Sequence, residues 1–468
     1  MRLGVILSSQ FVADDLVAEF GRIVPSQLPL ANKPLCDYQK TALAGMCDEI
    51  ICTLPQGHDS SWTQVNKLHL EQGLSLRDAI EEVLTSTPDV SEYVFYFGDT
   101  LLDFEFAKNT FFLGVPQFDY PSWYYTSSKE VFAGVFVVER GLLSSVLSSA
   151  TNTLALLQGL DNELDHLLVE GWFDFGNYTT YYNSKKRFLE TREFNTISVS
   201  EGAMLTKMSH DIGKMYFEYN WLDYYSAKHP VHCPTPKNFK ICGPKASYDL
   251  EYFPLPTLSD LYVFGLRDAE FWNNVLLRCQ TVLAKLQEGE VREKNNDEFY
   301  FEKVVERTNS FDYHSLGFSS SEIGDQLNLA KSLDNFDDEV GGAHGDFCFS
   351  NLLWDNRTST VKLIDPRGYM SRNLGQSILM PLRYDAFKLA HSFIGGYDWV
   401  IVKNRSHQAS DKALEFFLKT FGIERKWLVA GMSHLFFTMI PLHADREDRQ
   451  LKFVELAKKY HADYTSCR

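Results

Sequence analysis

The chain lacks most sequence features that mark membrane proteins, secreted proteins or proteins stabilised by bound zinc. Its 468 residues contain no apolar run long enough to span a membrane, and the opening "MRLGVILSSQFVADD" is too short in its apolar part for a signal peptide. The eight cysteines form no C-x-x-C pair and no Cys/His cluster at zinc spacing. We therefore expect a cytoplasmic protein with reduced thiols and no membrane partner.

Basic residues are also scarce. Lys and Arg number 45 against 62 Asp and Glu, which gives a formal charge of −17, and no Lys/Arg-rich run offsets it locally. Such a chain repels a nucleic-acid backbone, so polymeric nucleic acid is not an expected partner. A nucleotide is still compatible with this charge, because a few local cations, backbone amides and Mg²⁺ can hold its phosphates.

The first part of the chain alternates strand-like and helix-like runs. Examples are "LGVILSS", "EIICTL", the helical "LSLRDAIEEVLTS" and "EYVFYFGDT". This pattern predicts an α/β domain with a mostly parallel sheet over residues 1–190. Ligands of such sheets bind beyond the carboxyl ends of strands, which is where Asp99 falls.

The remaining sequence predicts an α+β domain in two lobes. Short β-rich runs, one helical run and the strand-like "SYDLEYF" indicate a small lobe over residues 191–256. The larger lobe, residues 257–468, is mostly helical, except where "NLLW" and "VKLI" flank the turn-rich "DNRTST" and predict a hairpin. The charged tract at residues 285–307 is interpreted as a solvated helical face.

One stretch, "GGAHGDFCFSNLLWDNRTSTVKLIDPRG", places three metal- or proton-binding side chains in a fixed order. Phosphoryl transfer needs a carboxylate near the attacking hydroxyl, metal ligands at the nucleotide phosphates and a lysine on those phosphates. Asp346 is the candidate proton acceptor and catalytic residue. Asn351, five positions later, and Asp365, at the end of the hairpin, are candidate Mg²⁺ ligands.

The motifs "HGDFCFSN" and "LIDPRG" resemble those of the aminoglycoside phosphotransferase and choline kinase family. The resemblance runs from about residue 194 to the C-terminus and implies a two-lobed protein-kinase-like fold, ATP, Mg²⁺ and a small-molecule hydroxyl acceptor. It implies that Lys207 pairs with Glu218 beside the nucleotide, with Lys214 as the rival lysine. Glu251 and Tyr252 are expected near the adenine.

The sequence also gives expectations for three further residues of this region, of which the one for Asp385 comes from the resemblance. His344 is expected to orient the loop by hydrogen bonds rather than to act as a base. Asp385, in "LRYDAFKLAHS", is expected to be structural. For Arg367 the sequence leaves a ligand contact and a solvated surface position open.

The first domain resembles sugar-phosphate nucleotidyltransferases over about residues 1–188. The segments that carry the resemblance are "LPLANKPLCDYQ", "YVFYFGDTLLD" and "GWFDFGNYTTYYNSKK". It implies a catalytic metal held by Asp99 and Asp174. The aromatic run at residues 118–128 is expected to be a packed loop, with a sugar-stacking wall as the alternative.

The phosphate-binding part of that pattern is degenerate. Where a glycine-rich loop with Arg is expected, the chain has "SSQFVADDLVAEFGR", and no lysine precedes "LP". Asp14 and Asp15 would repel a triphosphate at the place where backbone amides should attract it. Whether Arg22 or Lys33 compensates is left open by the sequence.

Together these observations predict an ATP- and Mg²⁺-dependent small-molecule kinase fused to a nucleotidyltransferase-like domain. Its acceptor would be the hydroxyl of a sugar, polyol or amino alcohol. The combination of a kinase domain with a nucleotidyltransferase-like domain suggests that the protein makes activated precursors for surface polysaccharide. The alternatives are nucleotidyl transfer as the main activity, or a non-catalytic ligand-binding scaffold. Acceptor identity and oligomeric state do not follow from the sequence.

Overall fold

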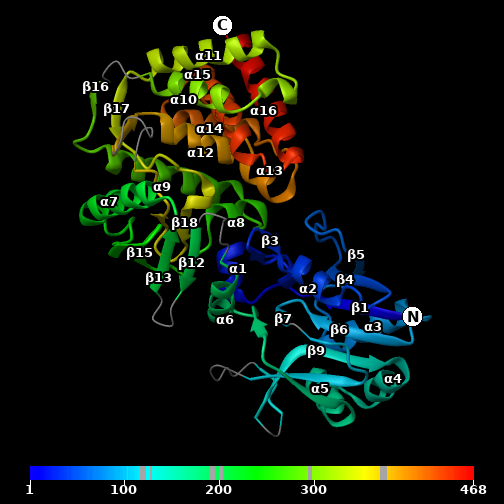
Figure 1. The fold of residues 1–468 in the computed structure, drawn as a ribbon. Helices are drawn as coiled ribbons and strands as arrows, with labels where there is room; N and C mark the ends of the chain where they lie inside the picture. Colours follow the sequence, from blue (N-terminus) through cyan, green and yellow to red (C-terminus); the bar gives the residue numbers. More distant parts are fainter. Residues whose placement is uncertain are drawn as a thin grey trace. The chain divides into compact units, whose positions relative to one another are not determined.

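The computed structural model describes residues 1–102, 104–115, 123–126, 129–189, 195–199, 204–293, 298–368 and 377–467. Contacts divide the chain into two compact units (Figure 1). Unit 1 comprises Met1–Leu189 with Phe264–Leu266, and unit 2 comprises Glu190–Val263 with Arg267–Arg468. No helix in the described ranges is long and apolar enough to cross a membrane.

Unit 1 is built on a seven-stranded sheet in the order β10-β8-β9-β6-β1-β4-β5. Neighbouring strands are parallel except β9, which runs antiparallel to both β6 and β8. The central strands of this sheet are buried on both faces, and their sequences are therefore nearly continuous apolar runs. The strands are β1 (Arg2–Leu7), β4 (Glu49–Pro55), β5 (Asn66–Leu70), β6 (Glu92–Phe97), β8 (Thr110–Gly114), β9 (Val131–Glu139) and β10 (Asp165–Val169).

The main core of unit 1 lies between this sheet and α3, α4 and α5. Leucines, valines and phenylalanines dominate it, and each helix contributes one apolar face. Ser75 and Asn152 cap the N-termini of α3 and α5 by accepting backbone N–H groups. The helices are α1 (Asp14–Phe20), α2 (Leu35–Leu43), α3 (Leu76–Ser86), α4 (Arg140–Ser149), α5 (Thr153–Glu163) and α6 (Tyr178–Lys185).

Two short ribbons complete unit 1. β2 (Pro29–Leu30) pairs with β3 (Lys33–Pro34), and β7 (Thr100–Leu102) pairs antiparallel with β11 (Trp172–Asp174). In the second ribbon Asp174 lies opposite Thr100, the residue after Asp99. The Phe175 amide then donates to the Asp99 carbonyl at 2.7 Å. This pairing brings together two aspartates that are far apart in sequence.

Unit 2 begins with a four-stranded antiparallel sheet in the order β12-β13-β15-β14, against which α7 packs. Asp211 caps α7 by accepting the Lys214 amide. These elements agree with the predicted small sheet and single helix. They are β12 (Asn195–Val199), β13 (Met204–Ser209), α7 (Ile212–Lys228), β14 (Lys237–Cys242) and β15 (Lys245–Glu251).

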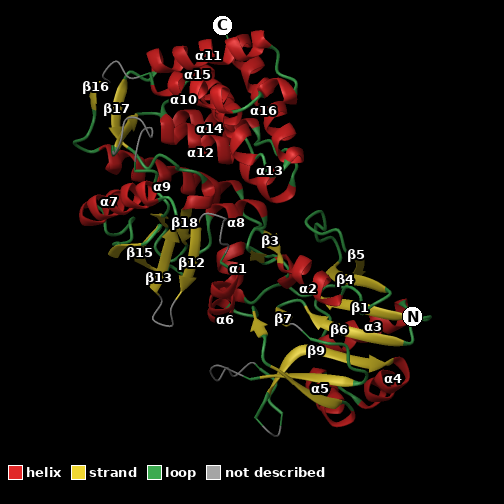
Figure 2. Ribbon diagram, viewed as in Figure 1, coloured by secondary structure: helices red, strands yellow, loops and turns green. Residues whose placement is uncertain are grey.

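Helices dominate the rest of unit 2 (Figure 2). The predicted hairpin is confirmed: β18 (Leu352–Asp355) pairs antiparallel with β19 (Thr360–Leu363). A second small sheet has the order β16-β17-β20. The other elements are α8 (Leu258–Val263), α9 (Ala269–Gln287), β16 (Arg292–Glu293), α10 (Phe299–Ser310), α11 (Ser320–Phe336), β17 (Glu339–Gly342), β20 (Leu379–Pro381), α12 (Tyr384–Phe393), α13 (Tyr397–Lys403), α14 (Asp411–Phe421), α15 (Arg425–Met439) and α16 (Glu447–Ser466).

Candidate active site

The loop between β17 and β18 holds Asp346 in a defined orientation. Asn351 donates from its side-chain nitrogen to Asp346 Oδ2 at 2.8 Å and to the Asp346 carbonyl at 2.9 Å. Lys388 on α12 places its Nζ 2.7 Å from Asp346 Oδ1. The Asp346 side chain is still 40% exposed, so it can meet a ligand, whereas Lys388 is only 8% exposed.

These contacts decide the charge of Asp346. Burial raises the pKa of its carboxyl, but Lys388, His344 and Asn351 together lower this pKa by more than burial raises it. The pKa of Asp346 therefore lies below the usual range. The carboxylate is therefore ionised at neutral pH. Lys388 was not among the candidate residues chosen from the sequence. Its only sequence signal is its position one helical turn after Tyr384, which places the two side chains on the same helix face.

The buried Asp385 fixes the backbone of the His344 loop. Its two carboxylate oxygens accept the backbone N–H groups of His344 at 2.6 Å and Gly345 at 2.9 Å. Burial raises the pKa of Asp385 to about 7, and the two amides oppose that rise. The geometry is that of a structural residue, which holds the loop backbone through both carboxylate oxygens.

The His344 ring is neutral and orients the same loop. Burial lowers its pKa to about 4. The Asp346 amide lies 3.3 Å from Nδ1, and Nε2 lies 3.0 Å from the Ile364 carbonyl, which fixes Nδ1 as acceptor and Nε2 as donor. Trp221 packs edge-on to the ring, with centroids 5.4 Å apart. His344 thus links the Asp346 loop to the strand that leads to Asp365.

Lys207 connects β13, α7 and the end of β19. Its ammonium group forms ion pairs with Glu218 and, at 2.8 Å, with Asp365 Oδ1. Lys207 and Glu218 are almost fully buried, while the Asp365 side chain is 46% exposed. Lys207, not Lys214, is thus the lysine that pairs with Glu218. Burial raises the pKa of Glu218, and the charge on Lys207 opposes that rise.

The Asp365 and Asn351 side chains have the chemistry expected of Mg²⁺ ligands. Both side-chain N–H groups of Asn351 point to Asp346, so its Oδ1 is turned the other way, where the Ser350 hydroxyl approaches to 3.4 Å. Asp365 adopts a left-handed backbone, with φ of 55°, which a turn must hold in place. An amide oxygen and a partly exposed carboxylate suit Mg²⁺, which binds oxygen ligands.

The two residues expected near adenine lie at the end of β15. Glu251 is exposed and pairs in register with Met204 on β13, whereas Tyr252 is 8% exposed. Both lie immediately before the segment that leads to α8. Their proposed contact with a base remains a prediction.

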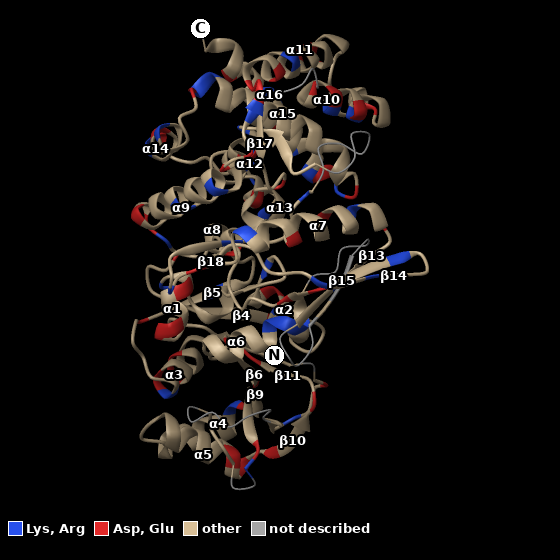
Figure 3. Cartoon of the chain, turned by 90° about the vertical axis from the view of Figure 1, so that its left-hand side faces the viewer, with Lys and Arg blue, Asp and Glu red and all other residues tan. Residues whose placement is uncertain are grey.

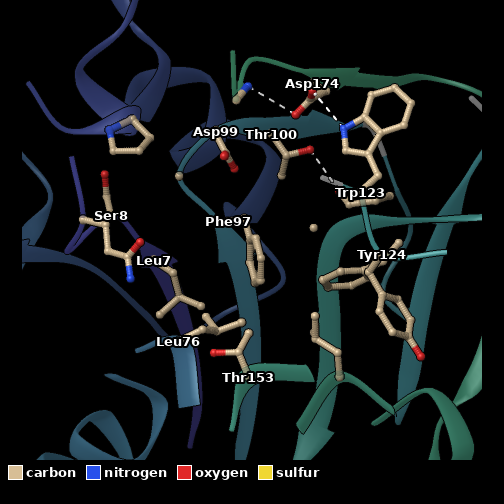
Figure 4. A pocket seen from close by; sticks show the side chains of 18 of the residues that line it. Leu7, Ser8, Leu76, Phe97, Asp99, Thr100, Trp123, Tyr124, Thr153 and Asp174 are labelled. Atoms are coloured by element: carbon tan, nitrogen blue, oxygen red, sulfur yellow. Dashed lines mark hydrogen bonds between the residues drawn. The ribbon is translucent and has the colours of Figure 1, made fainter. Parts of the chain in front are cut away.

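Unit 1 contains a separate cavity of about 510 Å³ at the carboxyl ends of β1 and β6 (Figure 4). Asp99 and Asp174 line it and face one another across Gly176. A Cβ built on Gly176 would stand 3.1 Å from Asp99 Oδ2 and 3.3 Å from Asp174 Oδ1. Trp123 donates from Nε1 to Asp174 Oδ2 at 3.2 Å. The glycine therefore leaves the space between the two carboxylates open.

The two carboxylates disfavour each other's charge. Burial, and then the charge on Asp174, raise the pKa of Asp99 to about 7, and burial also raises the pKa of Asp174. Among the described residues that line the cavity, none is Lys, Arg or His. Neither Arg22 nor Lys33 is among them, and Arg22 lies over the Phe11 ring instead, 4.2 Å from its centroid.

Two residues of the aromatic run, Trp123 and Tyr124, line this cavity. The expectation of a merely packed loop is thus incomplete for them, while residues 118–122 and 127–128 lie outside the described ranges. Within the described ranges no group of three or more His, Cys, Asp and Glu side chains is placed to hold a metal. The aspartate pair offers two carboxylates, which suits a divalent ion that completes its shell with water or substrate.

Comparison with known proteins gives matches among solved structures only. No protein-family model matches the chain, and no curated protein matches it. The choline kinase LicA from Streptococcus pneumoniae is 12% identical, with a TM-score of 0.41, over 60% of this chain and 93% of that one.

Two further solved structures are similar at the same level. An aminoglycoside phosphotransferase, APH(4)-Ia with ADP and hygromycin B, is 11% identical with a TM-score of 0.38, over 58% of this chain and 92% of that one. APH(2")-IIa with streptomycin and ATP is 10% identical with a TM-score of 0.38, over 59% and 92%. The function proposed below therefore rests on the side chains of this chain.

Proposed function

We propose that unit 2 is an ATP- and Mg²⁺-dependent kinase that phosphorylates a hydroxyl group of a small molecule. The observation that carries this proposal is the convergence of Asp346, Asn351 and Asp365 with the buried pair of Lys207 and Glu218. Lys207 bridges Glu218 and Asp365, as a lysine that positions nucleotide phosphates beside a metal ligand would.

In the proposed reaction the acceptor hydroxyl oxygen bonds to the γ-phosphorus of ATP. The bond from that phosphorus to the bridging oxygen breaks, ADP leaves, and the hydroxyl proton passes to Asp346. A carboxylate of such low pKa is a weak base, so Asp346 mainly orients the hydroxyl and accepts its proton late. Mg²⁺, when held by Asn351 and Asp365, would neutralise charge on the phosphates.

The test is acceptor-dependent ADP formation across sugars, polyols, hydroxy acids and amino alcohols. Asp346→Asn should lower turnover by about 10³-fold or more, because it removes the hydroxyl's acceptor. The matched control is Asp325→Asn, at an exposed position of α11, which should leave turnover unchanged. Equal turnover in Asp346→Asn and the native chain would contradict the proposal.

For unit 1 we propose ligand binding at the Asp99 and Asp174 cavity, with a divalent ion as one ligand. The cationless lining favours a binding role over nucleotidyl transfer, because a triphosphate would meet two carboxylates and no basic side chain there. Release of pyrophosphate from CTP, UTP or GTP with a sugar phosphate would instead support transfer. A role of the whole chain in making surface-polysaccharide precursors is part of this proposal and rests on the pairing of the two resemblances.

A further inference from the structure

Three basic side chains, Lys303, Lys388 and Arg367, gather near Asp346. Lys388 lies on α12 and pairs with Asp346 at 2.7 Å. One turn earlier on the same helix, the Tyr384 hydroxyl accepts from the Nζ of Lys303, on α10, at 2.6 Å. Lys303 and Lys388 therefore lie at the same face of α12, next to the Asp346 carboxylate that would hold the acceptor hydroxyl.

Arg367 belongs to the same group. Its backbone N–H donates to the His344 carbonyl at 2.8 Å, and its Cβ lies 2.8 Å from the position of a Cβ built on Gly345. Arg367 thus sits against the residue that precedes Asp346. Because Gly345 has a φ of 80° and no side chain, this close approach is possible.

Lys303 forms no ion pair within the described ranges, and its hydrogen bond goes to the neutral Tyr384 hydroxyl. Helix α10 carries both signs of charge (Figure 3), but its Glu302 and Glu306 are exposed. The tract at residues 285–307 was expected to be a solvated face, and Lys303 departs from that expectation because its side chain is partly buried against Tyr384.

The surroundings disfavour a positive charge on Lys303. Burial, then Arg367, Lys388 and Arg307, hold the pKa of Lys303 well below its usual range, and the smaller influence of Asp346 opposes them. An anion bound beside Lys303 would favour its charged form. His391 and His434 are at most 1% exposed, and no ring nitrogen of either has a hydrogen-bond partner among the residues that the structure describes. Burial and the nearby lysines hold both rings neutral by lowering their pKa.

The geometry points to an acceptor that carries an anionic group, a carboxylate or a phosphate ester, beside its reacting hydroxyl. Lys303, Lys388 and Arg367 would bind that group while Asp346 holds the hydroxyl. This inference rests on the kinase function proposed above. It selects hydroxy acids and sugar phosphates over amino alcohols, whose cationic end these side chains would repel.

The test compares matched acceptor pairs that differ in one anionic group. Suitable pairs are glycerate and glycerol, glucuronate and glucose, and ribitol 5-phosphate and ribitol, with choline as the cationic probe. The anionic member of at least one pair should give a kcat/KM at least about 10-fold above its neutral partner. The carboxylate and phosphate arms identify which anion is preferred.

Substitution of Lys303 then assigns the effect. Lys303→Met should raise the KM for the anionic acceptor about 10-fold or more, leave the KM for ATP within about twofold, and spare neutral acceptors. Lys303→Arg keeps the charge and should restore most of the affinity. Lys412→Met, at an exposed position of α14, is the matched control.

The outcomes separate the two proposals. Turnover of neutral or cationic acceptors with none of the anionic ones, or an equal effect of Lys303→Met on both members of a pair, overturns the anionic acceptor and leaves the kinase standing. If no compound gives ADP formation above the Asp346→Asn background, the kinase proposal fails and the acceptor inference fails with it.

Discussion

Two aspartate sites, one in each unit, use the same side chain in opposite electrostatic settings. In unit 2, Asp346 has Lys388 at 2.7 Å and a pKa below the usual range. In unit 1, Asp99 faces Asp174 with no cation among the described lining residues, and its pKa rises to about 7. The first site is charged and compensated by the chain itself, whereas the second is incomplete without a proton or a bound cation.

On the functions proposed above, the difference separates a site for chemistry from a site that receives a ligand. A carboxylate whose charge is held by a neighbouring lysine keeps its position and charge across the neutral pH range. A pair of facing carboxylates changes its charge with whatever binds. We therefore expect substitution of Asp346 to act mainly on turnover, and substitution of Asp99 or Asp174 to act on stability and binding.

The largest effect should come from Lys207→Met. Glu218 would be left as a buried charge without its partner, which typically costs about 3–5 kcal/mol of folding free energy. The KM for ATP should also rise by about 10-fold or more. Denaturant unfolding and initial-rate kinetics measure the two effects.

Two variants control this result. Lys214→Met should change both quantities little, because Lys214 does not form the ion pair with Glu218. The double variant Lys207→Met with Glu218→Gln should recover much of the stability without the activity. If Lys214→Met were the more damaging single change, the assignment of Lys207 would be wrong.

An intermediate effect is expected from Asp99→Asn on the stability of the chain. The folded pKa of Asp99, about 7, lies above the unfolded value near ~4, so the folded state binds more protons between these values. The contribution of Asp99 to stability is therefore most favourable at low pH and is lost as pH rises towards 7. Asp99→Asn should raise stability by roughly 1–3 kcal/mol at pH ~8 and by about a third of that at pH ~5, where the unfolded carboxyl is already ionised.

Calorimetric unfolding at the two pH values checks this prediction. Asp165→Asn, at an exposed position of β10, is the matched control and should show no such pH dependence. Destabilisation by Asp99→Asn to the same extent at both pH values would contradict the proposed repulsion between the carboxylates.

The smallest effect is expected from Gly176→Ala. The new Cβ would stand 3.1 Å from Asp99 Oδ2 and 3.3 Å from Asp174 Oδ1, which requires the carboxylates to shift by a few tenths of an ångström. Mn²⁺ binding to unit 1, measured by calorimetry, should weaken by about 10-fold or less. At Gly171 a Cβ would meet nothing within 4 Å, so Gly171→Ala should bind as the native chain does. Equal affinities of the two variants would argue against a metal between the carboxylates.

The sequence predicts motif residues better than it predicts their supporting contacts. The sequence points to Asp346, Asn351 and Asp365 as candidates because one short stretch carries all three in order. Lys388 and Lys303 were not among the candidates, because each lies on a helix with ordinary patterning, and only the packing of α10 and α12 brings them together. Spacing along the chain carries no information about such distant pairs.

The fold shows the same limit. The long buried strands and the hairpin of unit 2 follow from apolar runs and turn residues. The antiparallel direction of β9 does not, because a strand buried on both faces reads the same in either direction. Short strands such as β7 and β11, which bring Asp99 and Asp174 together, are too brief to show a period.

The most direct test of this division of labour is acceptor-dependent ADP formation by Asp346→Asn and Asp99→Asn, measured side by side with the same acceptor. We predict that Asp346→Asn loses about 10³-fold or more of kcat, while Asp99→Asn stays within about twofold of the native chain. A loss in Asp99→Asn as large as that in Asp346→Asn would contradict the assignment of the chemistry to unit 2.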